Sequence, residues 1–284
     1  MQAILVPTDF STNSQKALEI AAGLAVQANA ELVLLNVGDN VTNTSPIQEF
    51  VTFDQNSRGG LTQNARDYMV ELRRELMENP AFVPLKIRAE FYKGSLVPII
   101  ENYAEQYNID LIVMGTRGAS GLEELLIGSN TEKVIRRACC PVLAVPQEAK
   151  TGKITSVVFP STLKDNQKVV FRRMAAIQKT LGTGIQVQVL YINDPAGLGS
   201  EEAIQQRFRE LISDSQLLNT TFHLKGALDL DEGVEILRFA KEQQADIIAM
   251  GTHQRRGLSH LLLGSMTEDT VNHSEIPVLT IPIR

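Results

Sequence analysis

Short runs of consecutive apolar residues alternate along the whole chain with longer segments in which apolar residues recur at helical spacing. Each short run is bounded by turn signals, a pattern that predicts a buried strand. The longer segments predict helices, most clearly at 14–29. The segment 166–182 is the counterpart of this helix in the second half. The predicted strands are 3–7, 31–37, 85–92, 110–115, 141–146, 156–160, 186–192, 220–226, 246–251 and 277–282.

This alternation predicts an α/β fold. Parallel strands need a helix-length connection between them, and strands covered on both faces are apolar throughout. Each half is therefore expected to be a doubly wound, Rossmann-like domain with a five-stranded, mainly parallel sheet and helices on both faces. The junction is the polar segment 147–153, so the domains are placed at 1–147 and 153–284. Because this linker is short, we expect the two domains to pack together.

Composition narrows the class of protein. The 284 residues are 43% hydrophobic and 21% charged, with a net charge of -6 that argues against nucleic acid as a partner. No apolar run approaches the ~20 residues that span a bilayer, and the first residues do not resemble a signal peptide. We therefore expect a cytoplasmic protein that is not a membrane protein. The adjacent Cys139 and Cys140 are expected to be buried and reduced.

The stretch 114–146 is repeated without a gap at 250–282, as "MGTRGASGLEELLIGS" and "MGTHQRRGLSHLLLGS" at their starts. In the first copy, Gly115 and Gly118 follow a predicted strand, and a helix is expected to begin after Gly128 with Ser129 or Asn130 as its cap. Such a helix start presents N–H groups and a positive dipole end to an anion such as phosphate. On spacing alone, these glycines could equally be turn and capping residues. No Walker A or G-x-G-x-x-G motif accompanies them.

The position of these residues also predicts a shared crevice. Ligands of open parallel sheets lie beyond the carboxyl ends of the strands, where the strand order reverses. The segments "VPTD" after the first strand, "LLNV" at the end of the second and "MGTRG" after the fourth would surround one such crevice.

The connection 38–60 has no clean periodicity, and it is either a functional flap or a flexible insert.

The array Gly115-x2-Gly118-x9-Gly128-Ser129, followed by "TEKVIRRACCPVLAVP" and preceded by "ILVPTDFS", resembles the universal stress protein family. The chain is similar to a tandem member with two such domains. In this family the domains dimerise through the final strand, so the resemblance implies that the two halves pair within the chain as a pseudo-twofold pair. A homodimer of the tandem chain is left open.

The resemblance implies an adenine nucleotide site for ATP, or for AMP or ADP, with Mg²⁺ held through the phosphates. Asp9 would accept hydrogen bonds from the ribose hydroxyls, although a turn or helix-cap role is its alternative. The Val37 backbone would face the adenine edge. Arg117 would either pair with phosphate or remain solvated. Pro7, Thr8 and Met114 would line the pocket; Gly115 and Gly118 would let the chain approach the ligand; Gly128, Ser129 and Asn130 would bind phosphate.

The second half departs from this pattern at two positions. Thr162 stands where the first half has Asp9, and Gln254 stands where it has Gly118, while Gly251, Gly264 and Ser265 are retained. We therefore expect one nucleotide per chain. The second domain then either keeps its fold for packing or binds a different anion through "HQRRG", residues 253–257.

The function that this resemblance implies is that of a stress-response ATP-binding protein. An enzyme that hydrolyses ATP slowly or transfers an adenylyl group is the first alternative, and a nucleotide-free interaction scaffold is the second. No catalytic residue and no metal ligand from the protein are predicted, because the first half has no histidine and the four histidines of the second half show no metal-site spacing.

Overall fold

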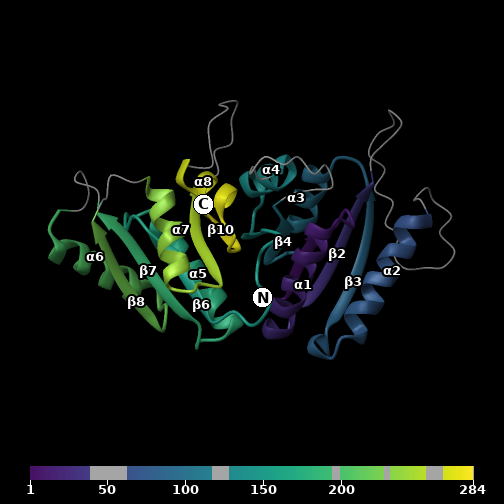
Figure 1. The fold of residues 1–284 in the computed structure, drawn as a ribbon, viewed down its shortest axis with the longest axis horizontal. Helices are drawn as coiled ribbons and strands as arrows, with labels where there is room; N and C mark the ends of the chain where they lie inside the picture. The colour runs from purple at the N-terminus through teal and green to yellow at the C-terminus, as the bar shows by residue number, and fades with distance from the viewer. Residues whose placement is uncertain (39–62, 117–127, 194–198, 227–230, 254–264, 284) are drawn as a thin grey trace. The chain divides into compact units, whose positions relative to one another are not determined.

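The computed structural model describes residues 1–38, 63–116, 128–193, 199–226, 231–253 and 265–283 (Figure 1). The described residues form two compact units, which divide between Gln147 and Glu148. All ten predicted strands are present, and their bounds differ from the predicted ones by no more than two residues at either end. The connection expected at 38–60 lies almost wholly outside the described residues.

The first unit is a parallel sheet with the strand order β3-β2-β1-β4-β5. The chain runs outward from β1 to β3 and then crosses to the other side of β1 to form β4, so the strand order reverses between β1 and β4. Loops that leave these two strands diverge to opposite faces of the sheet and open a crevice between them. The strands are β1 (Ala3–Pro7), β2 (Glu31–Gly38), β3 (Lys86–Lys93), β4 (Leu111–Gly115) and β5 (Val142–Val145).

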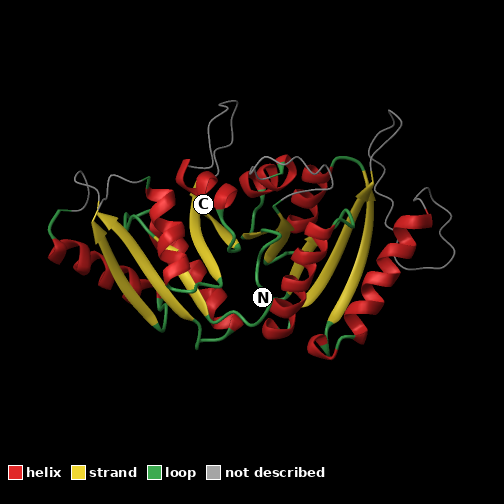
Figure 2. Cartoon of the chain, viewed as in Figure 1, coloured by secondary structure: helices red, strands yellow, loops and turns green. Residues whose placement is uncertain are grey.

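Helices cover both faces of this sheet (Figure 2). In α1, the stripe predicted from the sequence is buried, because Ala17, Leu18, Ala21, Leu24 and Ala25 are each at most 3% exposed. Ile4, Leu5 and Val6 of β1 have no exposed surface, as expected for a strand covered on both faces. The helices are α1 (Thr12–Ala28), α2 (Gln63–Glu78), α3 (Leu96–Gln106) and α4 (Ser129–Arg137), with a short 3₁₀ helix η1 (Pro80–Phe82).

The second unit repeats this topology with the strand order β8-β7-β6-β9-β10, again wholly parallel. The prediction of two doubly wound α/β folds is therefore confirmed. Its strands are β6 (Ser156–Pro160), β7 (Gln186–Asn193), β8 (Thr220–Gly226), β9 (Ile247–His253) and β10 (Val278–Ile283). Its helices are α5 (Gln167–Leu181), α6 (Glu201–Ser215), α7 (Glu232–Glu242) and α8 (Ser265–His273). Within the described residues, no helix is both long and apolar enough to span a membrane.

Candidate functional site

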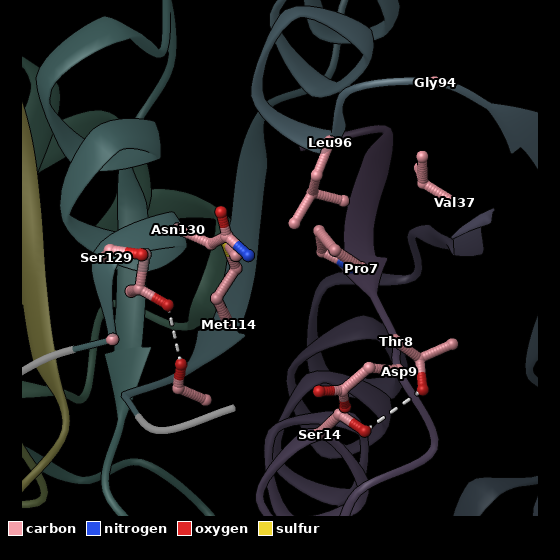
Figure 3. Close-up of a pocket in the computed structure, with 13 residues that line it drawn as sticks. Pro7, Thr8, Asp9, Ser14, Val37, Gly94, Leu96, Met114, Ser129 and Asn130 are labelled. Atoms are coloured by element: carbon pink, nitrogen blue, oxygen red, sulfur yellow. Dashed lines mark hydrogen bonds between the residues drawn. The ribbon is translucent and has the colours of Figure 1, made fainter. Parts of the chain in front are cut away.

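A pocket of about 300 Å³ lies at the carboxyl ends of β1, β2 and β4 and at the start of α4 (Figure 3). It is the crevice expected where the strand order reverses. Arg117 and Gly118, also predicted for this site, lie outside the described residues. The predicted site residues that line the pocket are Pro7, Thr8, Asp9, Val37, Met114, Gly115, Gly128, Ser129 and Asn130.

Four further residues line the pocket without having been predicted. Gly94 and Leu96 reach it from the β3–α3 connection, while Ser14 belongs to the first turn of α1 and Thr131 to that of α4. In Figure 3, Leu96, Val37 and Pro7 lie together, and Ser129 and Asn130 lie across the pocket from them. The turn signal "KGS" at 93–95 marks the β3–α3 connection in the sequence, but nothing local indicates that it reaches the pocket at the end of β1.

The loop after β1 is held by backbone and side-chain hydrogen bonds. The Thr8 N–H donates to the Leu35 carbonyl at 2.8 Å, and the buried Asn36 amide donates to the Thr8 carbonyl at 2.8 Å. The Phe10 N–H donates to Thr8 Oγ1 at 3.1 Å, which supports a left-handed backbone at Phe10 with φ of 63°. These bonds fix the backbone on both sides of Asp9.

The Asp9 carboxylate also bonds within this loop. Its Oδ1 accepts from the Ser11 N–H at 3.1 Å and from the Ser11 hydroxyl at 2.5 Å. This is the turn role weighed as the alternative for Asp9. Ser11, and not Asp9, is the N-cap of α1, because its Oγ accepts from the Ser14 N–H at 3.2 Å. Since Asp9 also lines the pocket, the turn geometry is compatible with ligand binding.

The Val37 peptide groups face the side of β2 on which β1 lies. Successive peptide groups along a strand point to opposite sides, and the Leu35 carbonyl points to the β1 side because it accepts from Thr8. The Gly38 carbonyl points to the other side, where it accepts from Gly94. The β1–β2 ladder ends at the pair of Pro7 and Leu35, so the Val37 groups lie beyond its last pair, at the pocket.

The start of α4 forms the opposite wall. The prediction that Ser129 or Asn130 caps this helix is wrong: Gly128 is the N-cap, with φ of -58° and ψ of 137°, and it makes no side-chain cap bond. The first helical residue is Ser129, so neither Ser129 nor Asn130 is at the cap position. Their side chains are exposed and line the pocket. Thr131 Oγ1 donates to the Gly115 carbonyl at 2.8 Å and ties α4 to β4. The N–H groups of the first helical turn have no intrahelical acceptors and favour an anion.

Gly115 has a packing reason for being glycine. A Cβ at this position would lie 2.8 Å from the Asn13 carbonyl oxygen and 3.2 Å from its Cβ. Distances below 3.0 Å to backbone are not tolerated without movement of α1. The close approach at Gly115 is therefore made by α1, and an approach by a ligand remains a prediction.

The second unit keeps the loop after its first strand but not its chemistry. The Ser161 N–H donates to Leu190 at 2.9 Å, and the Leu163 N–H donates to Ser161 Oγ at 3.1 Å, as Thr8 and Phe10 do in the first unit. Between them stands Thr162, which cannot offer the acceptor pair of a carboxylate. Gln254, the second predicted difference, lies outside the described residues.

Side chains of α5 pack against the end of β9 in the second unit. A Cβ on Gly251 would lie 2.8 Å from Val170 Cγ2 and 3.4 Å from Gln167 Oε1. Both side chains are buried. α5 thus packs against Gly251 as α1 packs against Gly115 in the first unit. Among the residues that the structure describes, no group of three or more His, Cys, Asp or Glu side chains could hold a metal ion.

Comparison with known proteins identifies relatives of both units. A family model described as the universal stress protein family matches residues 1–146 and 227–282. Universal stress protein YxiE of Bacillus subtilis (strain 168) is 32% identical over 143 residues, which cover 50% of this chain and 97% of that protein. Universal stress protein MJ0531 of Methanocaldococcus jannaschii is 32% identical over 148 residues, which cover 52% of this chain and 83% of that protein.

A solved structure shares the fold over almost the whole chain. It is the crystal structure of a universal stress protein from Archaeoglobus fulgidus DSM 4304, with a TM-score of 0.68 and 20% sequence identity. The alignment covers 99% of this chain and 98% of that chain. The similarity therefore extends through both units.

Proposed function

Because this chain belongs to the universal stress protein family, we propose that it binds one adenine nucleotide, ATP, in the pocket of its first unit. The observation that carries the proposal is the convergence of Asp9, Val37 and the start of α4 on one pocket of about 300 Å³. These groups come from segments far apart in the sequence. Each supplies a different chemistry, and together they match the base, the ribose and the phosphates of a nucleotide.

The base would lie against the apolar side chains of Pro7, Leu96 and Met114. The Val37 N–H and carbonyl provide a donor and an acceptor next to each other, which suits the adenine edge with its ring nitrogen and amino group.

The sugar and phosphates would take the polar side of the pocket. Asp9 offers only acceptors when ionised, which matches a pair of ribose hydroxyl donors. The phosphates would bind at the N-terminus of α4, where Ser129 and Asn130 add polar side chains to the backbone N–H groups. Mg²⁺ would bind through the phosphate oxygens of the nucleotide and would supply charge neutralisation there.

The proposed role is that of a cytoplasmic binding protein in a stress response and not that of an enzyme. The polar side chains among the described residues that line the pocket are Asp9, hydroxyls and an amide, and none of them is a histidine. Thr8 and Ser14 hydroxyls bond to each other at 3.1 Å, so neither is arranged as an activated nucleophile beside a base.

Calorimetric titration with ATP, ADP, AMP and GTP tests the proposal. We expect a stoichiometry near one ATP per chain and weaker binding of GTP, whose base edge has the opposite donor and acceptor pattern. Asp9→Ala should weaken ATP binding at least tenfold, about 1.4 kcal/mol. Thr162→Ala, the matched change in the second unit, should leave it unchanged. A stoichiometry of two would contradict the single site, and absence of binding to the wild-type protein would refute the proposed function.

A further inference from the structure

The Ser11 hydroxyl links the start of α1 to the carboxylate of Asp9. The Ser11 oxygen accepts a hydrogen bond from the Ser14 N–H at 3.2 Å, which is the N-cap bond of α1. The same hydroxyl donates a hydrogen bond to Asp9 Oδ1 at 2.5 Å. The Ser11 N–H donates to the same carboxylate oxygen at 3.1 Å. Both donors of Ser11 therefore converge on one oxygen of Asp9.

Two neighbouring hydroxyls, those of Thr8 and Ser14, are engaged elsewhere. Ser14 Oγ donates its proton to the Ser11 carbonyl at 2.9 Å. The contact of 3.1 Å between the Thr8 and Ser14 hydroxyls must then use the Thr8 proton, and Thr8 Oγ1 accepts from the Phe10 N–H. With these protons assigned, Ser11 supplies a hydroxyl hydrogen bond to the carboxylate that neither Thr8 nor Ser14 supplies.

This arrangement matters because Asp9 is an exposed side chain at the pocket. An exposed aspartate that lacks a partner samples several rotamers, and binding a ligand then costs the free energy of ordering it. Two hydrogen bonds to one oxygen fix the plane of the carboxylate before the ligand arrives. They therefore set the direction in which Asp9 can accept hydrogen bonds from a ribose.

The second unit has lost both members of this pair. Thr162 stands in place of Asp9, and Lys164, four residues after the end of β6, stands in place of Ser11, four residues after the end of β1. The N-cap of α5 is Asn166, which makes no side-chain cap bond. The cap serine and the carboxylate are thus absent together from the second unit.

We propose that Ser11 is a positioning residue that orients the Asp9 carboxylate and so makes the site selective for nucleotides that carry ribose hydroxyls. The inference rests on the proposed nucleotide function and deepens it. It goes beyond that function in assigning the selectivity to a residue that lies outside the pocket lining.

The test compares ATP with 2′,3′-dideoxy-ATP by calorimetric titration of two Ser11 variants. Ser11→Gly removes the hydroxyl, and glycine is itself a tolerated N-cap residue, so helix capping is weakened only slightly. We expect Ser11→Gly to weaken ATP binding roughly three- to tenfold, because Asp9 loses one hydrogen bond that orients it. The affinity for dideoxy-ATP should stay within about twofold of the wild-type value, because this ligand has no ribose hydroxyls for Asp9 to bind. Ser11→Thr keeps the hydroxyl and should retain both affinities. Ser200→Gly, which removes the N-cap serine of α6 in the second unit, controls for loss of a cap.

The outcomes separate this inference from the proposed function. If Ser11→Gly weakens ATP and dideoxy-ATP equally, Ser11 only supports α1 and the positioning role is overturned. If Asp9→Ala weakens ATP binding but Ser11→Gly does not, the nucleotide site stands and the role of Ser11 falls. If the wild-type protein binds neither nucleotide, the proposed function itself fails. Urea unfolding of each variant verifies that the folded state is retained.

Discussion

The Thr8 and Ser14 hydroxyl oxygens lie 3.1 Å apart on the wall of the first unit's pocket (Figure 3). In the second unit the position of Ser14, seven residues after the end of the first strand, is taken by Gln167. Gln167 is 6% exposed and reaches towards the end of β9. The position that carries a small hydroxyl side chain on the pocket wall of the first unit therefore carries a longer, buried amide in the second.

Ser14→Gln should close the pocket of the first unit. The added atoms would enter the space proposed for the nucleotide, so we expect ATP affinity to fall at least tenfold, measured by calorimetric titration. Gln167→Ser is the matched control in the second unit and should leave ATP affinity unchanged, because Thr162 still lacks the carboxylate. Unaltered ATP binding by Ser14→Gln would show that this wall does not contact the ligand.

Gly115→Ala should lower both stability and ATP affinity. Its Cβ would lie 2.8 Å from the Asn13 carbonyl oxygen, so α1 has to move, at a cost of about 1–3 kcal/mol in the free energy of unfolding. In Gly251→Ala the new Cβ would lie 2.8 Å from Val170 Cγ2. This change should also destabilise the protein, but it should leave ATP affinity unchanged. Urea denaturation and titration of both variants give the comparison. Equal ATP affinities of Gly115→Ala and wild type would mean that the two glycines serve packing alone.

The fold could be predicted from the sequence because its strands are buried on both faces. Runs such as Ile4, Leu5 and Val6, all without exposed surface, have no polar alternation that would confuse them with surface strands. The positions of Asp9 and Met114 in one pocket followed from the same logic, since carboxyl ends of parallel strands meet at one edge of a sheet.

The rest depended on tertiary contacts that a local pattern does not encode. Leu96, at the start of α3, lines the same pocket as Pro7 of β1, although β2 separates β3 from β1 in the sheet. The cap of α4 falls on Gly128 because the backbone turns there, before the better capping side chain of Ser129. The close neighbour of Gly115 is α1, which sequence spacing could not identify.

Asp246→Ala should destabilise the protein by removing the anchor of β6. Asp246 Oδ2 accepts from the Thr155 N–H at 2.7 Å, the Thr155 hydroxyl at 2.9 Å and the Ser156 N–H at 3.0 Å. In the first unit, Asp110 accepts from Ala3 at the start of β1 in the same way. Hydrogen bonds to a charged group contribute about 1.5–3 kcal/mol, and partial exposure reduces this, so we expect a loss of about 1–2 kcal/mol. Urea denaturation measures it, and Asp246→Asn, which keeps an acceptor, should lose less.

Glu90 gives a prediction about pH. Its side chain on β3 is 5% exposed, and burial raises its pKa above the usual value, although Arg88 at 3.5 Å and the Tyr103 hydroxyl at 3.4 Å oppose the shift and Glu31 adds to it. The folded state therefore holds this proton more tightly than the unfolded state. The stabilisation is fully present below the unfolded pKa and is lost as the pH rises through the raised, folded pKa.

Glu90→Gln should remove this loss, because an amide has no proton to release. Below the unfolded pKa of about 4.5 both proteins carry a neutral group, so the difference in free energy of unfolding between variant and wild type reflects side-chain chemistry alone. As the pH rises to 7 the difference should move in favour of the variant, since only wild type then buries a charge. Arg88 keeps its ion pair with Glu31 at 3.2 Å, which limits the cost of losing the Glu90 partner. Urea unfolding at pH 4 and pH 7 measures the change, and Glu105→Gln, at an exposed position of α3, controls for net charge. A difference that moved towards wild type with rising pH would mean that the ion pair with Arg88 outweighs the burial of the carboxylate.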